Sequence, residues 1–115
     1  MQVINLTRGQ VIAGQVCLAD TFWRRLRGLL GTKGLPVGSG LVIRPCNSVH
    51  TLGMTYPIDV AFVDREGRVL KTVAALPPGR TAVCLGSVWV LELPAGQLAA
   101  TGTLPGDTLA LLDQN

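Results

Sequence analysis

The sequence predicts an α+β fold: a single compact domain with a mostly antiparallel, partly closed β-sheet, one main helix over about 21–30 and a short second helix over about 95–100. Two apolar runs, 58–63 and 69–76, flank Asp64-Arg65-Glu66-Gly67, a turn whose glycine suits a hairpin. Apolar residues at helical spacing indicate the main helix. Further short apolar runs separated by Gly and Pro indicate additional strands. Short strands with one main helix are typical of an α+β architecture.

Size and composition favour one folded domain over residues 1–115. The chain is 48% hydrophobic and 15% charged, which excludes a disordered polyelectrolyte. No apolar run reaches the roughly 18 to 20 residues of a membrane span, so no span is expected. The N-terminus lacks the basic start and apolar centre of a signal peptide. Three cysteines without a Cys-x-x-Cys spacing fit a reducing compartment, and we expect a cytoplasmic location.

The main helix is the clearest element of the sequence. Asp20 or Thr21 offers an N-cap oxygen, and Gly31 follows the last apolar residue as a C-terminal cap. The apolar stripe consists of Phe22, Trp23, Leu26, Leu29 and Leu30. We expect this stripe to cover one face of the sheet through Phe22, Trp23, Leu26 and Leu30. Trp23→Asp should then unfold or strongly destabilise the domain.

The same helix carries three of the ten basic residues, Arg24, Arg25 and Arg27, in a chain of net charge +3. A nucleic-acid module would add aromatic stacking platforms or a longer basic stripe, and only 4% of the residues are aromatic. The arginines are therefore interpreted as a solvated helix face, and no nucleic-acid partner is predicted.

Other strands follow from alternating or continuous apolar runs bounded by Gly and Pro. The segment from 47 to 51 could be extended, and two faces would then alternate along it: Cys46, Ser48 and His50 on one, and Asn47, Val49 and Thr51 on the other. The remaining predicted strands are 11–18, 41–43, 87–93 and 108–112.

The segment 46–54 gathers polar and soft side chains, among them the single histidine, His50. Such a cluster offers donors and acceptors to a small polar ligand, or satisfies the backbone of an irregular loop. The predicted ligand-binding residues are Asn47, Ser48, His50 and Thr51 from this segment, together with Asp59, Arg80 and Glu92.

Asp59 and Glu92 each interrupt an apolar strand, where an unpaired charge is costly. The sequence favours structural partners, such as backbone donors or a side chain of Arg44, Arg80 or His50. The alternative is a pair of acid–base groups with separated pKa values. We expect Asp59 to be buried and to accept hydrogen bonds from the 46–54 segment, chiefly from backbone N–H groups or Thr51, with an arginine as the alternative donor.

Cys46, His50 and Met54 recur at four-residue intervals and would suit copper(I) if they lay on one helix face. Gly53 and the nearby prolines oppose a helix, and no second histidine or close cysteine pair completes a zinc set. No metal site and no cofactor are therefore predicted. A Cys46–His50 thiolate nucleophile stays open as an alternative, beside a buried, inert cysteine.

Several blocks of the sequence resemble the domain-of-unknown-function 192 family. They are Arg27-Gly28-Leu29-Leu30, Ser48-Val49-His50-Thr51-Leu52-Gly53-Met54, Pro57-Ile58-Asp59-Val60-Ala61-Phe62-Val63-Asp64, Leu91-Glu92-Leu93-Pro94-Ala95-Gly96 and Gly106-Asp107. They cover roughly 11–112 in the family order. The resemblance implies a compact α+β fold with a mostly antiparallel, partly closed sheet. It implies no established activity, cofactor or substrate.

The leading functional hypothesis is a non-catalytic binding or accessory module that uses the polar 46–54 segment. Its partner would be a small polar ligand or a protein whose identity the sequence does not specify. The alternative is a small enzyme that uses Asp59, Glu92 and His50 as acid–base groups, or Cys46 as nucleophile. A third hypothesis is that the arginine-bearing helix docks on a larger assembly.

Overall fold

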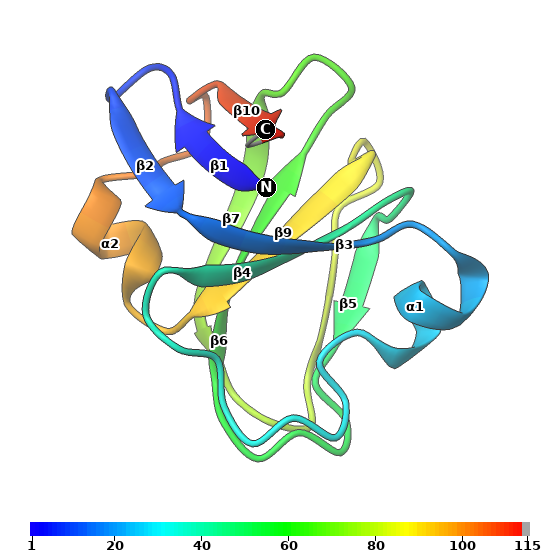
Figure 1. Cartoon of the computed structure of the whole chain (residues 1–115). Coiled ribbons are helices and arrows are strands. Elements are labelled where there is room, and N and C mark those ends of the chain that lie inside the picture. The colour runs from blue at the N-terminus through cyan, green and yellow to red at the C-terminus, as the bar shows by residue number, and fades with distance from the viewer. Residues whose placement is uncertain (114–115) are drawn as a thin grey trace.

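A computed structural model describes residues 1–113. The chain forms three sheets and two short helices (Figure 1). The strands are β1 (Gln2–Asn5), β2 (Gln10–Ala13), β3 (Gln15–Ala19), β4 (Ser39–Ile43), β5 (Ser48–His50), β6 (Ile58–Val63), β7 (Val69–Leu76), β8 (Thr81–Val83), β9 (Trp89–Pro94) and β10 (Leu109–Leu112); the helices are α1 (Phe22–Arg27) and α2 (Gln97–Thr101). Within these residues no helix is long and apolar enough to cross a membrane.

The central sheet has the order β3-β4-β9-β6-β7, and all its pairings except β3–β4 are antiparallel. The predicted hairpin of 58–63 and 69–76 is confirmed as β6 and β7, and the strand predicted at 87–93 is β9 beside it. Two smaller sheets, β10-β1-β2 and β5-β8, complete the domain without closing a barrel. The α+β class predicted from the sequence is therefore confirmed.

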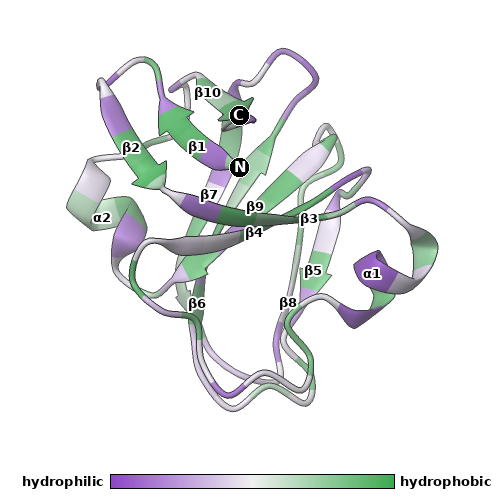
Figure 2. Ribbon diagram, in the orientation of Figure 1, coloured by the Kyte–Doolittle hydropathy of each residue, from purple (hydrophilic) through white to green (hydrophobic). Residues whose placement is uncertain are grey.

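Each face of the central sheet buries its own apolar cluster, because β6 and β9 contribute apolar side chains to both faces. The hydropathy colouring shows β9 as mainly hydrophobic (Figure 2). On one face, Ala61 and Leu93 pack with residues of β1, β2, β10 and α2, such as Val3 and Leu98. On the other face, Val60, Phe62 and Val90 lie with Leu29 and with Val49 of β5. Successive side chains of a strand point to opposite faces, so neighbouring residues of β9 pack into different clusters.

The strand predicted at 11–18 is two strands. It divides at Gly14, where the chain leaves the small sheet as β2 and enters the central sheet as β3 (Figure 1). Residues 2–5 and 81–83 form strands that the sequence did not predict. Both are short, and such runs gain their strand structure from their partners in the sheet: β10 and β2 for β1, and β5 for β8.

The prediction for the main helix is wrong in its C-terminal end and in its packing on the sheet. Thr21 does cap it, because its Oγ1 accepts from the Arg24 N–H at 3.2 Å, but the helix ends at Arg27 with Gly28 (φ +50°) at the C-cap. No residue of α1 is buried, and Trp23 is 74% and Phe22 59% exposed. Their rings pack edge-to-face on each other, with 5.1 Å between centroids, instead of on the sheet. Helical periodicity indicated the element, but of its apolar stripe only Leu29, which follows the helix, reaches the core.

This exposure reverses the expected result of Trp23→Asp. The substitution removes little buried area, so we expect it to lower the free energy of unfolding by about 1 kcal/mol or less and the melting temperature by a few degrees. Circular dichroism during heating measures the change. Phe62→Ala is the matched control, since Phe62 is fully buried and its truncation should cost about 3 to 5 kcal/mol. Equal losses in the two variants would mean that Trp23 packs on the core.

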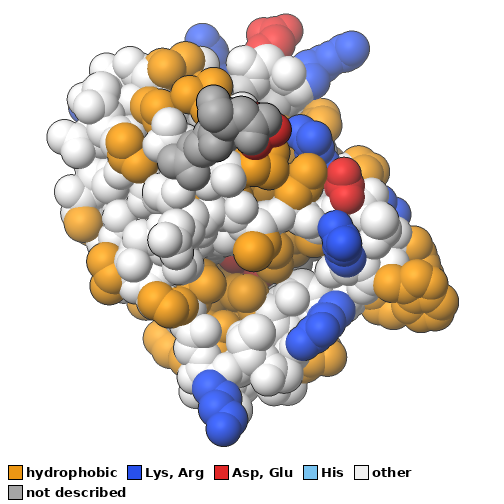
Figure 3. Space-filling view, in the orientation of Figure 1, with side chains coloured by type: hydrophobic (Ala, Val, Ile, Leu, Met, Phe, Trp, Pro, Cys, Tyr) orange, Lys and Arg blue, Asp and Glu red, His pale blue; other side chains and the backbone are white. Residues whose placement is uncertain are grey.

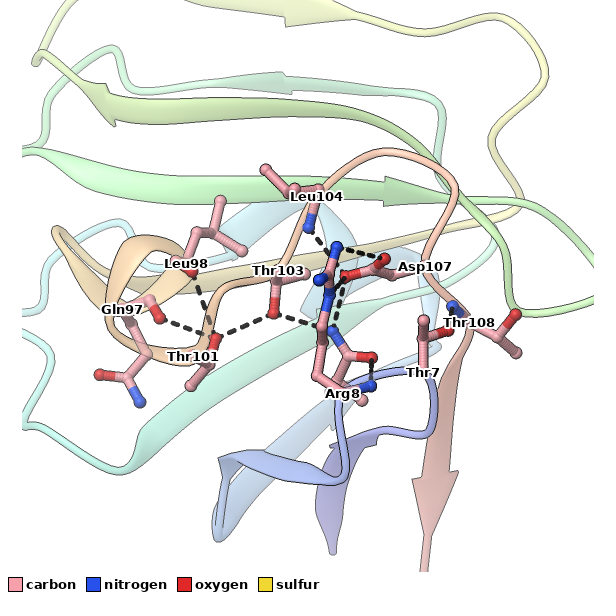
Figure 4. A network of polar contacts seen from close by, with 10 residues as sticks. Thr7, Arg8, Gln97, Leu98, Thr101, Thr103, Leu104, Asp107 and Thr108 are labelled. Atoms are coloured by element: carbon pink, nitrogen blue, oxygen red, sulfur yellow. Dashed lines mark hydrogen bonds and ion pairs between the residues drawn. The ribbon is translucent and has the colours of Figure 1, made fainter.

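A polar network ties the end of the chain to its beginning (Figure 4). The Asp107 carboxylate accepts from the Asn5 amide, the Arg8 guanidinium and the Leu104 N–H, at 3.0 to 3.2 Å. The hydrogen bond from Arg8 is the main cause that lowers the pKa of Asp107 to about 2. Asn5 also donates to Thr103, which extends the network toward α2. These contacts lie away from the pocket described next and have a structural role.

Candidate functional site

A pocket of about 350 Å³ lies between α1 and the face of the central sheet that carries Glu92. Its volume falls within the usual range of about 300 to 1,000 Å³ for small-molecule sites. Three parts of the chain line it: α1 with the residues that follow it, the segment from Ile43 to Met54, and Glu92 of β9. In the space-filling view, apolar and basic side chains gather together over α1 at the right edge of the molecule (Figure 3).

The segment 46–50 is held in place by its backbone. Cys46 donates its N–H to the Val88 carbonyl at 2.9 Å, and the Cys46 carbonyl accepts from the Ser87 hydroxyl at 3.0 Å. The Asn47 carbonyl accepts from the Cys84 N–H at 2.9 Å, and β5 pairs with β8. With the backbone engaged and Val49 in the core, the side chains of Asn47, Ser48 and His50 are exposed and line the pocket. The predicted alternation holds for Ser48 and His50, which lie opposite Val49, whereas Asn47, predicted on the face of Val49, precedes β5 and is exposed.

Glu92 is the buried charge of the pocket. Its side chain lies between the cross-strand neighbours Leu41 and Val60, and only 4% of the residue is exposed. Among residues 1–113 no hydrogen bond or ion pair reaches its carboxyl group, so none of the structural partners expected from the sequence is present. Burial alone raises the pKa of Glu92 to about 7. Glu92 is thus an ionisable group that lacks a protein partner and lines a cavity.

Cys46 lies beside this carboxyl group, and its thiol donates to the Ser48 carbonyl at 3.0 Å. Burial is the main cause that raises the pKa of the Cys46 thiol; the charge of Glu92 acts in the same direction, while Arg25 opposes it. A nucleophilic cysteine needs the opposite shift, because the thiolate is the reactive form. The electrostatics of Cys46 therefore do not favour the nucleophile hypothesis, although His50 lines the same pocket.

The outer wall of the pocket is apolar and basic. Phe22, Leu26 and Leu30, all exposed, line it from α1 and the turn after it. Arg25 and Arg27 line it from the same helix. Within residues 1–113 neither arginine forms an ion pair. The apolar side chains of this region that do not pack in the core thus form one side of a cavity, and Glu92 lies on the opposite side.

Asp59 is buried and accepts hydrogen bonds from backbone N–H groups, as expected. The donors, however, lie outside the 46–54 segment. Its carboxylate accepts from Ala75 at 2.8 Å, Gly96 at 3.1 Å and Leu98 at 2.9 Å. Asp59 is the register partner of Leu93, whereas Val60 is the partner of Glu92, so the two carboxylates lie on opposite faces of the sheet. The geometry therefore does not bring Asp59 and Glu92 together as an acid–base pair. Asp59 joins β7 to the start of α2.

Thr51 and Arg80 also lie outside the pocket lining. Thr51 is fully buried; its hydroxyl donates to the Pro77 carbonyl at 2.6 Å and accepts from the Arg80 N–H at 2.9 Å. These bonds join the end of β5 to the turn between β7 and β8. Of the seven predicted ligand-binding residues, the pocket brings together Asn47, Ser48, His50 and Glu92.

Cys46, His50 and Met54 all line the pocket, although they do not share a helix. Within the described part of the chain, His, Cys, Asp and Glu side chains form no group of three or more that could hold a metal ion. Sequence reasoning missed Phe22, Leu26, Arg25 and Arg27 as lining residues, because it assigned the first two to the core and the arginines to plain solvent. The mixture of exposed apolar and basic residues on one short helix was the available signal.

The fold and the pocket define a small α+β domain with a ligand-sized cavity, and comparison with known proteins gives its family. The family model of DUF192, described as an uncharacterized ACR, matches residues 3–111, and the chain belongs to this family. A UPF0127 protein of Thermococcus sibiricus is 31% identical over 111 residues, which are 93% of this chain and 72% of that protein. A UPF0127 protein of Thermococcus kodakarensis is 30% identical over 112 residues, 94% of this chain and 71% of that protein.

A solved structure has the same fold. The crystal structure of a protein of unknown function from Novosphingobium aromaticivorans superposes with a TM-score of 0.85 at 25% sequence identity, covering 96% of this chain and 84% of that one. These comparisons establish the family and the fold.

Proposed function

We propose that this protein is a non-catalytic binding module whose ligand is a small molecule held in the pocket between α1 and Glu92. The observation that carries the proposal is Glu92, a residue only 4% exposed, whose carboxyl group opens onto a cavity of about 350 Å³ and has no protein partner among residues 1–113. A buried polar group without a partner costs about 1 to 3 kcal/mol, and a charged one costs more. A ligand that supplies a hydrogen-bond donor offsets this cost.

The other lining groups support the same function. Asn47, Ser48 and His50 offer donors and acceptors, and the exposed side chains of Phe22 and Leu26 offer an apolar surface. An apolar cavity with a few convergent polar groups and one perturbed ionisable residue is the usual form of a small-molecule site. The enzyme alternative loses support, because Asp59 lies on the opposite sheet face and the pKa of Cys46 is raised.

We also place the protein in the cytoplasm as part of this proposal. Cys17, Cys46 and Cys84 are all free thiols, which fits a reducing compartment.

A thermal-shift screen of a chemically diverse set of small molecules tests the function. A ligand of the folded state raises the melting temperature in proportion to its occupancy. We expect hits on the wild-type protein whose affinity falls by about fivefold or more in His50→Ala, because a lining group is lost. Thr81→Ala is the matched control: Thr81 is the cross-strand partner of His50 but does not line the pocket. The proposal fails if no compound stabilises the protein, or if both variants affect the hits equally.

A further inference from the structure

We infer that the pocket binds a small zwitterion of the amino-acid class, with its ammonium group on Glu92, its anionic group at Arg25 and Arg27, and an apolar substituent against the α1 wall. This inference rests on the proposed function and specifies the chemistry of its ligand. Three features of the pocket carry it, one for each part of the ligand.

The first feature is the unpartnered carboxyl group of Glu92. Among residues 1–113 its neighbours across the strands are Leu41 and Val60, so no protein cation neutralises it. An ammonium group supplies both a positive charge and several N–H donors, and charge-assisted hydrogen bonds of this kind are roughly twice as strong as neutral ones. A ligand with only a carboxylate would instead meet the like charge of Glu92.

The second feature is the pair of arginines on the opposite side. Arg25 and Arg27 line the pocket and have no carboxylate partner in the described part of the chain. Glu92 lines the same cavity, so the two opposite charges lie around one ligand-sized space. Arginine binds carboxylates through a planar fork of donors. A ligand that is only cationic would be repelled here, and the net charge of +3 adds to this repulsion.

The third feature is the apolar wall between these charges. Phe22 is 59%, Leu26 57% and Leu30 42% exposed, and all three line the pocket. Covering apolar surface contributes about 25 cal/mol per Å². An apolar or aromatic substituent on the zwitterion would cover this wall. The cavity of about 350 Å³ has room for a ligand of this size.

Isothermal titration calorimetry at pH 8 with three matched probes tests each part of the inference. Phenylalanine carries both charged groups, 2-phenylethylamine lacks the carboxylate, and 3-phenylpropanoate lacks the ammonium group. We expect phenylalanine to bind at least about tenfold more tightly than either analogue. In Glu92→Gln, phenylalanine and 3-phenylpropanoate should bind with equal affinity. In the double variant Arg25→Gln, Arg27→Gln, phenylalanine and 2-phenylethylamine should bind with equal affinity.

Arg24→Gln is the control, because Arg24 belongs to the same helix but does not line this pocket. Circular dichroism establishes that each variant is folded. Either analogue binding as tightly as phenylalanine overturns the inference, and so does an equal loss of binding in Arg24→Gln. If phenylalanine fails to bind while the diverse screen gives hits that depend on His50, the ligand class is wrong and the binding function stands. If neither experiment gives a ligand, both fail.

Discussion

Asp59→Ala should lower the free energy of unfolding by about 4 kcal/mol, because three backbone N–H groups, one buried and two partly buried, lose their acceptor at once. The residue is 1% exposed, so water does not replace the lost carboxylate oxygens easily. One of the donors belongs to Ala75, whose φ of +49° is unusual for a residue other than glycine. In a domain of 115 residues the loss corresponds to a fall in melting temperature of more than about 10 °C.

Chemical denaturation of two further variants separates this bracing from a general effect of removing a charge. Asp59→Asn keeps one acceptor oxygen and should lose about half as much free energy. Asp64→Ala also removes the acceptor of two backbone N–H groups, but in the exposed β6–β7 turn, and should cost about 1 kcal/mol or less. Similar losses for Asp59→Ala and Asp64→Ala would show that Asp59 does not brace β7 and α2.

Glu92→Leu should have the opposite effect and stabilise the protein at alkaline pH. The folded-state pKa of Glu92 is raised from 4.5 to about 7, so the folded protein binds more protons than the unfolded chain between these values. The wild type therefore loses stability as pH rises through this window, by about 3 kcal/mol in full at pH 8. Leucine has no charge to bury and removes the penalty.

Urea denaturation at pH 5 and pH 8 measures this difference. The stability gained by Glu92→Leu should be small at pH 5 and grow to about 3 kcal/mol at pH 8. Glu66→Leu, at an exposed turn position, should change stability by about 0.5 kcal/mol or less at both pH values. If the stability gained by Glu92→Leu were the same at both pH values, ionised Glu92 would not destabilise the folded protein. Glu92→Leu should also lose ligand binding, because a group that binds a ligand often lowers the stability of the folded protein.

The sequence predicted those parts of the fold that depend on local pattern. The β6–β7 hairpin followed from two apolar runs around Asp64-Arg65-Glu66-Gly67, and β9 followed from an apolar run bounded by Gly and Pro. The cap of α1 followed from Thr21. Each of these signals lies within a few residues of the element that it specifies, so tertiary contacts did not override it.

The orientation of α1 could not be predicted in the same way. A helical stripe of Phe22, Trp23, Leu26 and Leu30 is normally a core face, and the pattern does not distinguish a core from the wall of a pocket. Here Leu29 and the strand residues already fill the cluster on that sheet face, and the helix lies beside it. The missed β8 has the same origin, since its partner β5 is distant in the chain. The missed β1 has one distant partner, β10, and one nearby partner, β2.

The sequence predicted the kinds of side chain in the candidate site, but not which residues line the pocket. Glu92 and the 46–54 segment were recognisable from residue types, and the structure places them around one cavity. Thr51 and Asp59 looked similar in the sequence, but their oxygens hold backbone donors of the fold. The register of β6 against β9 decides between these roles, because it sends Asp59 and Glu92 to opposite faces.

The most direct test of the account is the titration of the Glu92 carboxyl group, followed by carbon-13 NMR of its side chain in the absence of ligand. A buried carboxyl group without a protein partner should titrate with a pKa of about 7, well above the ordinary value of 4.5. A value near 4.5 or below would contradict the account, because it would mean that water or a protein donor already satisfies Glu92 and that the pocket holds no unpaired charge for a ligand.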